Sequence, residues 1–162
     1  MTADLFEDVE LWYPYYRLLE EGHTVDLVGC EAGVTHPGKK GTEATTTVAA
    51  GAVEPADYDG VVVPGGFSPD YMRRCRDMVE FIRQIGMSGK PTAAICHGPW
   101  MLASAGLLDG RDVTSFHSIR DDIENAGAEW HDKEMVRDEN IITSRSPEDL
   151  PSFMREVIEA LG

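Results

Sequence analysis

Short apolar runs of strand length alternate along the chain with amphipathic stretches whose apolar residues recur at helical spacing. Residues 60–64 form a continuous β-branched run, which is typical of a strand buried on both faces. A run over residues 93–95 predicts another strand, and residues 23–28 alternate between apolar and polar as a strand does. Helices are expected over residues 2–21, 69–85, 97–105, 118–125 and 148–161. This alternation predicts an α/β layer fold with a largely parallel sheet.

The remaining segments complete this pattern without adding a second unit. Residues 33–47 are rich in Gly, Thr and Lys, and we expect them to form a hairpin or an excursion beside the sheet. A strand near residues 112–115 and short strands within residues 130–143 are also expected. Because the sequence contains no internal repeat or linker, residues 1–162 are predicted to form a single domain.

The start of the chain departs from the expected topology. A doubly wound sheet places a strand before its first crossover helix, yet the predicted helix begins within the first three residues, Met1, Thr2 and Ala3. We therefore expect a first strand to be missing from the chain, or the sheet to lack a strand near its middle. Such a sheet would expose unpaired backbone groups along an edge.

Composition adds a strongly anionic surface to this picture. The formal net charge is -15, from 29 acidic and 14 basic residues, while hydrophobic residues make up 42% of the chain. Because nucleic acid and anionic membranes are bound through clustered Lys and Arg, neither is expected as a partner. An acidic surface with few lysines is also suited to a salt-rich cytoplasm, and we predict a halophilic origin on this ground.

Cysteine usage indicates a reducing compartment. Cys30, Cys75 and Cys96 are odd in number and show no paired spacing, so we expect neither a disulfide framework nor a zinc site. No metal or other cofactor is expected either. The sequence shows no charged-then-apolar leader and no long apolar run, which predicts a cytoplasmic protein.

The segment around Cys96 is the strongest candidate for chemistry. An apolar run ends abruptly in Cys96, and His97, Gly98 and an amphipathic stretch follow at once, which predicts a strand-to-helix elbow. A thiol at such a turn is expected to be acidified by the helix dipole and a nearby imidazole, which makes it a nucleophile. The alternative is a buried cysteine at a strand end, because free cysteine is among the most buried residue types.

A cysteine enzyme also needs donors for an oxyanion and a group that moves protons. The backbone N–H groups of Gly66 and His97 are the expected donors, with an ordinary strand-end turn as the alternative for Gly66. His97 is the first candidate for the base, and His117 is the reserve candidate. Among the acids of the first helix, Asp8 and Glu10 are expected to face water as partners of the helix dipole.

Motifs along nearly the whole chain resemble the PfpI intracellular-protease family. This family belongs to a superfamily that includes the Parkinson-disease deglycase and resembles glutamine amidotransferases in fold. The matches occur in order and are specific. The matching segments are ADLFEDVE at 3–10, VPGG at 63–66, AICHGP at 94–99, RDD at 120–122, NAGAEW at 125–130 and TSRSPEDL at 143–150.

The resemblance implies a flavodoxin-like three-layer sandwich with Cys96 on the nucleophile elbow. It further implies that Glu7 is hydrogen-bonded to the sulfur as a protonated carboxyl, whose pKa is raised by burial beside an anion. His97 would be completed by an acidic residue of an adjacent subunit. That residue is Asp70 here, where the family commonly carries the longer glutamate. Because the site would be completed by a second subunit, the chain is expected to form a homo-oligomer, a dimer or a hexamer.

Two enzymatic functions are compatible with this site, and a third function belongs to another class. In the first, Cys96 adds to a reactive carbonyl such as methylglyoxal, or to its adduct with an amine, as in a glyoxalase or deglycase. In the second, Cys96 attacks a peptide carbonyl as a peptidase does. A compact pocket favours the small carbonyl. The third function is an oxidative-stress sensor or holdase in which Cys96 is oxidised.

Overall fold

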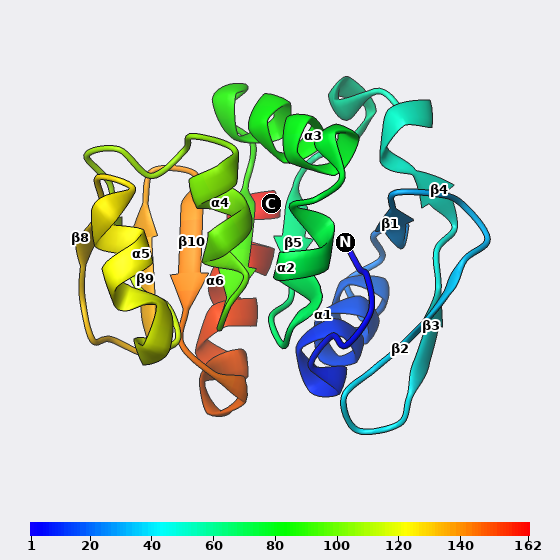
Figure 1. The fold of residues 1–162 in the computed structure, drawn as a ribbon, viewed down its shortest axis with the longest axis horizontal. Helices are drawn as coiled ribbons and strands as arrows, with labels where there is room; N and C mark the ends of the chain where they lie inside the picture. The colour runs from blue at the N-terminus through cyan, green and yellow to red at the C-terminus, as the bar shows by residue number, and fades with distance from the viewer.

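The structure is a computed structural model that describes residues 1–162, and a mostly parallel sheet forms its centre (Figure 1). In this sheet, β5 (Val61–Val63) pairs with β6 (Thr92–Ile95), and β6 pairs with β10 (Ile141–Ser144), in both cases in parallel. β9 (Met135–Asp138) pairs with β10 in the antiparallel direction and forms the edge. β1 (Val28–Gly29) and β4 (Val48–Ala49) form a separate parallel pair.

Helices cover both faces of the sheet, which confirms the predicted α/β sandwich. α1 (Asp8–Glu20) and α6 (Leu150–Leu161) pack on one face, where a core forms around Ala93, Ile95 and Phe153. The helices of the other face share a larger core with Ala94 of β6. They are α2 (Ser68–Met72), α3 (Arg76–Met87), α4 (Pro99–Ser104) and α5 (Arg120–Asn125). Successive residues of β6 thus face opposite cores, as strand geometry requires.

Short elements connect these layers. β7 (Asp112–Val113) pairs in parallel with β8 (Glu129–Trp130) beside the main sheet. Single 3-10 turns occur at Ala50–Ala52, Pro55–Asp57, His117–Ile119 and Pro147–Asp149. None of the helices is both long and apolar enough to pass through a bilayer.

The helix predicted over residues 69–85 is interrupted, and a disulfide lies at the interruption. α2 ends at Met72 and α3 begins at Arg76, with Cys75 in extended conformation between them. The Cys75 sulfur is bonded to that of Cys30, which follows β1. The expectation of no disulfide is therefore wrong. It failed because a pairing between residues that are 45 positions apart leaves no local spacing signal.

The first residues of the chain lie between the main sheet and the separate pair of strands β1 and β4. The structure has no strand in residues 1–7, as expected, but the Met1 amino group donates to the Val62 carbonyl at 2.9 Å. The Thr2 N–H donates to the Val28 carbonyl at 3.0 Å, so this segment bridges β1 and β5. A cavity of about 700 Å³ lies beside the bridge. Its lining includes Leu27, Val61, Phe81, Val157 and Leu161.

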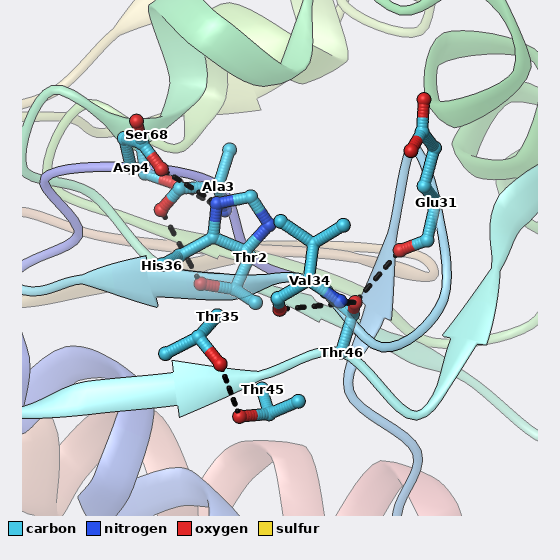
Figure 2. A network of polar contacts seen from close by, with 10 residues as sticks. All are labelled: Thr2, Ala3, Asp4, Glu31, Val34, Thr35, His36, Thr45, Thr46 and Ser68. Carbon is cyan, nitrogen blue, oxygen red and sulfur yellow. Dashed lines mark hydrogen bonds and ion pairs between the residues drawn. The ribbon is translucent and has the colours of Figure 1, made fainter.

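The predicted hairpin is present next to the N-terminal segment. β2 (Thr35–Pro37) and β3 (Glu43–Thr45) pair in the antiparallel direction. His36 Nδ1 contacts Asp4 Oδ1 at 2.6 Å, and the hydroxyls of Thr35 and Thr45 contact each other across the two strands at 2.9 Å. Both contacts are drawn in Figure 2, and the first one ties the hairpin to the chain that leads into α1.

We predict that the disulfide between Cys30 and Cys75 stabilises the fold. Closing a loop with a separation of 45 residues is expected to raise the free energy of unfolding by about 4 kcal/mol in the chain-entropy model. Thermal melts in the absence and presence of a dithiol reductant should therefore show a reductant-dependent decrease in Tm for wild type. Cys75→Ser should melt at the lower temperature in both conditions, while Cys96→Ser should respond as wild type does. Equal wild-type Tm values in both conditions would contradict this prediction.

Candidate active site

Cys96 occupies a sharp turn between β6 and α4, as the elbow prediction requires. Its φ is 62°, in the left-handed region that residues with a side chain rarely adopt. Hydrogen bonds on both sides hold this conformation. The Cys96 N–H donates to the Ser144 carbonyl at 3.0 Å, and its carbonyl accepts from the Phe116 N–H at 2.9 Å. The surrounding structure thus fixes an unfavourable backbone conformation at the candidate nucleophile.

Two backbone donors converge on the sulfur. The N–H groups of Gly66 and His97 both donate hydrogen bonds to Cys96 and so favour its ionised form. Gly65 allows this close approach, because a Cβ there would lie 2.6 Å from the Cys96 Cβ and 2.8 Å from the His97 nitrogen. The structure therefore brings together the two donors that were predicted from the sequence.

The carboxyl group beside the sulfur belongs to Glu10. Glu10 is fully buried, its Oε2 accepts from the Gly65 N–H at 2.8 Å, and its side chain interacts with the Cys96 thiol. Its Oε1 is buried and has no hydrogen-bond partner. Burial raises the pKa of Glu10 to about 7, and the negative charge of Glu7 adds to this effect.

Glu7, which was expected to hold the sulfur, lies outside this contact. Its Oε2 instead accepts from the Lys39 ammonium at 2.9 Å. Asp8 and Glu10 were expected to face water, but both are buried. Glu7 precedes the first turn of α1, whereas Glu10 lies on the same helical stripe as the buried Pro14 and Leu18. The four-residue spacing of these three positions is the signal that could have identified Glu10.

The pKa of Cys96 moves in the opposite direction from the expected one. The cysteine is 8% exposed, and burial together with the nearby Glu10 charge raises its pKa to about 12. The hydrogen bonds from Gly66 and His97 only partly offset this. α4 is a helix of six residues, so its dipole is short. Cys96 and Glu10 therefore form a buried pair in which a second negative charge is strongly disfavoured.

His97 is close to the sulfur but has no carboxylate partner within the chain. Its Nδ1 lies 3.2 Å from the Cys96 Sγ, and its Nε2 lies 3.3 Å from the Ser118 hydroxyl. Burial, together with the positive charge of Lys39, lowers the pKa of His97, so the ring is neutral at neutral pH. Sequence reasoning missed Ser118, which is 21 residues away along the chain.

Two further candidates lie away from the sulfur. Asp70 is on α2, where it forms an ion pair with Arg74 at the surface. A contact between Asp70 and the His97 of another subunit stays a prediction. His117 is exposed and packs its ring against Phe116, with ring centroids 4.4 Å apart. Of the two histidines proposed as the base, His97 is thus the one that contacts the thiol.

Known proteins match this chain over nearly its whole length. A family model described as DJ-1/PfpI family matches residues 1–160. Deglycase PfpI of Pyrococcus furiosus is 47% identical over 161 residues, which are 99% of this chain and 96% of that protein. Protein/nucleic acid deglycase 2 of Escherichia coli is 44% identical in an alignment of 165 positions that covers 100% of this chain and 95% of that protein.

A solved structure shows the same fold in a longer protein. It is a crystal structure from Anabaena variabilis of a two-domain protein containing dj-1/thij/pfpi-like and ferritin-like domains. The TM-score is 0.96 at 36% sequence identity, and the match covers 98% of this chain. This chain spans only 46% of that protein's length.

We predict that Glu10, and not Glu7, controls the ionisation of Cys96. Glu10→Gln removes the adjacent negative charge, so the pKa of Cys96 falls and the ultraviolet absorbance of its thiolate appears at a lower pH. At a fixed pH below that pKa, the thiolate fraction should increase about tenfold for each unit of pKa lost. Glu7→Gln is the matched control and should shift the profile much less. Identical profiles for the two variants would refute the assignment.

Proposed function

Because the chain belongs to the DJ-1/PfpI family, we propose that it is a deglycase-type enzyme in which the Cys96 sulfur attacks reactive carbonyls or their adducts with amines. Its relatives named deglycases match almost the full chain, which supports an enzymatic, hydrolase-like role. The observation that carries the proposal is the buried pair of Cys96 and Glu10 beneath two convergent N–H donors.

Glu10 is the group that generates the nucleophile. Its pKa, raised by burial to about 7, suits a base that must accept a proton at neutral pH and later return it. The buried Oε1 has no hydrogen-bond partner, so it is available to accept the thiol proton. As Cys96 attacks, its proton moves to Glu10, and the total charge of the buried pair does not increase. The raised pKa of the resting thiol is therefore compatible with nucleophilic attack.

The two backbone donors stabilise the charge that then develops. When the sulfur bonds to an aldehyde carbon, the carbonyl π electrons move to oxygen and an alkoxide forms on the carbon that is now bonded to sulfur. The N–H groups of Gly66 and His97 already point toward the sulfur, so they lie near this oxygen. Donors fixed in advance in a site with little water are typically the largest single contribution to such catalysis.

His97 is the candidate for the subsequent proton shift. For a 2-oxoaldehyde such as methylglyoxal, the hemithioacetal loses a proton from the carbon bonded to sulfur and gains one at the neighbouring carbon. The product of this shift is a thioester. A neutral imidazole that contacts the sulfur at 3.2 Å can accept and return that proton. Water then cleaves the thioester, which releases a 2-hydroxy acid and regenerates the thiol without an external oxidant or reductant.

We expect this activity to depend on Cys96 and His97. NMR of reactions with methylglyoxal should show formation of the 2-hydroxy acid by wild type and none by Cys96→Ser. His97→Ala should lower the rate by about 10²–10⁴-fold, as is typical of a lost general base. His117→Ala is the matched control and should retain most of the activity.

A fluorogenic peptide provides the opposing measurement. Cleavage of this peptide that depends on Cys96, without consumption of methylglyoxal, would replace the proposal with a peptidase. Oxidation of Cys96 by peroxide without turnover of either substrate would favour a sensor instead. Either result would overturn the carbonyl chemistry proposed above.

A further inference from the structure

Lys39 lies next to the candidate active site, in the turn between β2 and β3. Its ammonium donates to Glu7 Oε2 at 2.9 Å and lies 5.8 Å from the centroid of the Phe67 ring. Phe67 directly follows Gly66, whose N–H contacts the sulfur. The Lys39 side chain is 33% exposed, whereas that of Glu7 is only 13% exposed. The ammonium thus lies between the buried site and solvent.

The hairpin turn is held firmly, so this position of Lys39 is not that of a loose surface side chain. The Lys39 N–H donates to the Phe6 carbonyl at 2.9 Å. The buried Asp8 carboxylate accepts from the N–H groups of Lys40 and Thr42, at 2.7 and 2.9 Å. The other end of the hairpin is tied through His36 and Asp4, as Figure 2 shows. The backbone on both sides of the ammonium is therefore fixed.

The positive charge of Lys39 interacts electrostatically with all three reacting groups, Cys96, His97 and Glu10. It stabilises the ionised form of Glu10, interacts with the charge of Cys96, and contributes to the lowered pKa of His97. An ammonium has three N–H donors, and Glu7 takes one of them. The other donors, on a side chain that is one-third exposed, remain for a ligand that enters from solvent.

We infer that Lys39 makes the Cys96 site selective for electrophiles that carry a carboxylate within a few bonds of the carbon attacked by sulfur. This inference rests on the proposed reaction of Cys96 with a small electrophile, and it names the charge of the preferred substrate. The carboxylate would bind the free donors of Lys39 at the entrance. The reacting carbon would then face the sulfur and the N–H groups of Gly66 and His97.

The charge of the rest of the chain makes such a local cation necessary for an anionic substrate. A net charge of -15 repels anions at long range, and Glu7 and Glu10 both lie beside the site. The chain has lysine only at positions 39, 40, 90 and 133. Lys39 places one of these few positive charges at the site, where a contact with an anion is screened least.

Alkylation with two reagents of similar size tests the inference without requiring turnover. Iodoacetate carries a carboxylate next to the reacting carbon, whereas iodoacetamide is neutral, and Cys96 is the free cysteine of the chain. The ratio of the two rates at one fixed pH reports selectivity, because the thiolate fraction cancels. We expect Lys39→Gln to lower the iodoacetate-to-iodoacetamide ratio about fivefold. Glu7→Gln should raise the ratio by freeing the ammonium.

Lys40→Gln is the matched control, because it removes the same charge from the neighbouring, exposed position. It should change the ratio less than twofold. An unchanged ratio in Lys39→Gln, or an equal decrease in both lysine variants, would overturn the inference. If the ratio falls only in Lys39→Gln while methylglyoxal is not consumed, the carbonyl reaction fails and the anion selectivity stands.

Discussion

The contact between a buried carboxyl group and a buried thiol determines how the rest of this site is built. Glu10 reaches Cys96 because α1 begins beside the turn at Gly65, whose N–H holds the carboxyl. Cys96 reaches Glu10 because its left-handed conformation lifts the sulfur out of β6. The two groups disfavour being ionised at the same time. One proton therefore moves between them during the reaction, and the total charge of the pair stays the same.

Sequence patterns predicted the parts of the molecule that depend on neighbours in the chain. The elbow at Cys96, the donors at Gly66 and His97, and the sandwich of helices around a parallel sheet each have a local signature. Glu10 was missed because first-turn acids are usually solvated, and only its alignment with Pro14 and Leu18 indicates an inward direction. The Cys30–Cys75 bond and the contact of His97 with Ser118 join distant residues and have no such signature.

The family relationship and the geometry support different parts of the functional argument. The similarity to proteins named deglycases extends over almost the whole chain and supports the class of enzyme. It says nothing of which glutamate contacts the sulfur or what charge the substrate carries, because function depends on the site and not on the fold. Those points rest on the burial of Glu10 and on the placement of Lys39 by the Asp8-anchored turn.

The buried carboxyl also makes folding a proton-binding event. Because the pKa of Glu10 is raised from 4.5 to about 7 by burial, the native chain retains a proton there that the unfolded chain has already released. Unfolding between these pH values therefore releases a proton, and the contribution of Glu10 to stability declines as pH rises through this window. Near neutral pH the molecule thus sacrifices part of its conformational stability to keep a reactive acid in its interior.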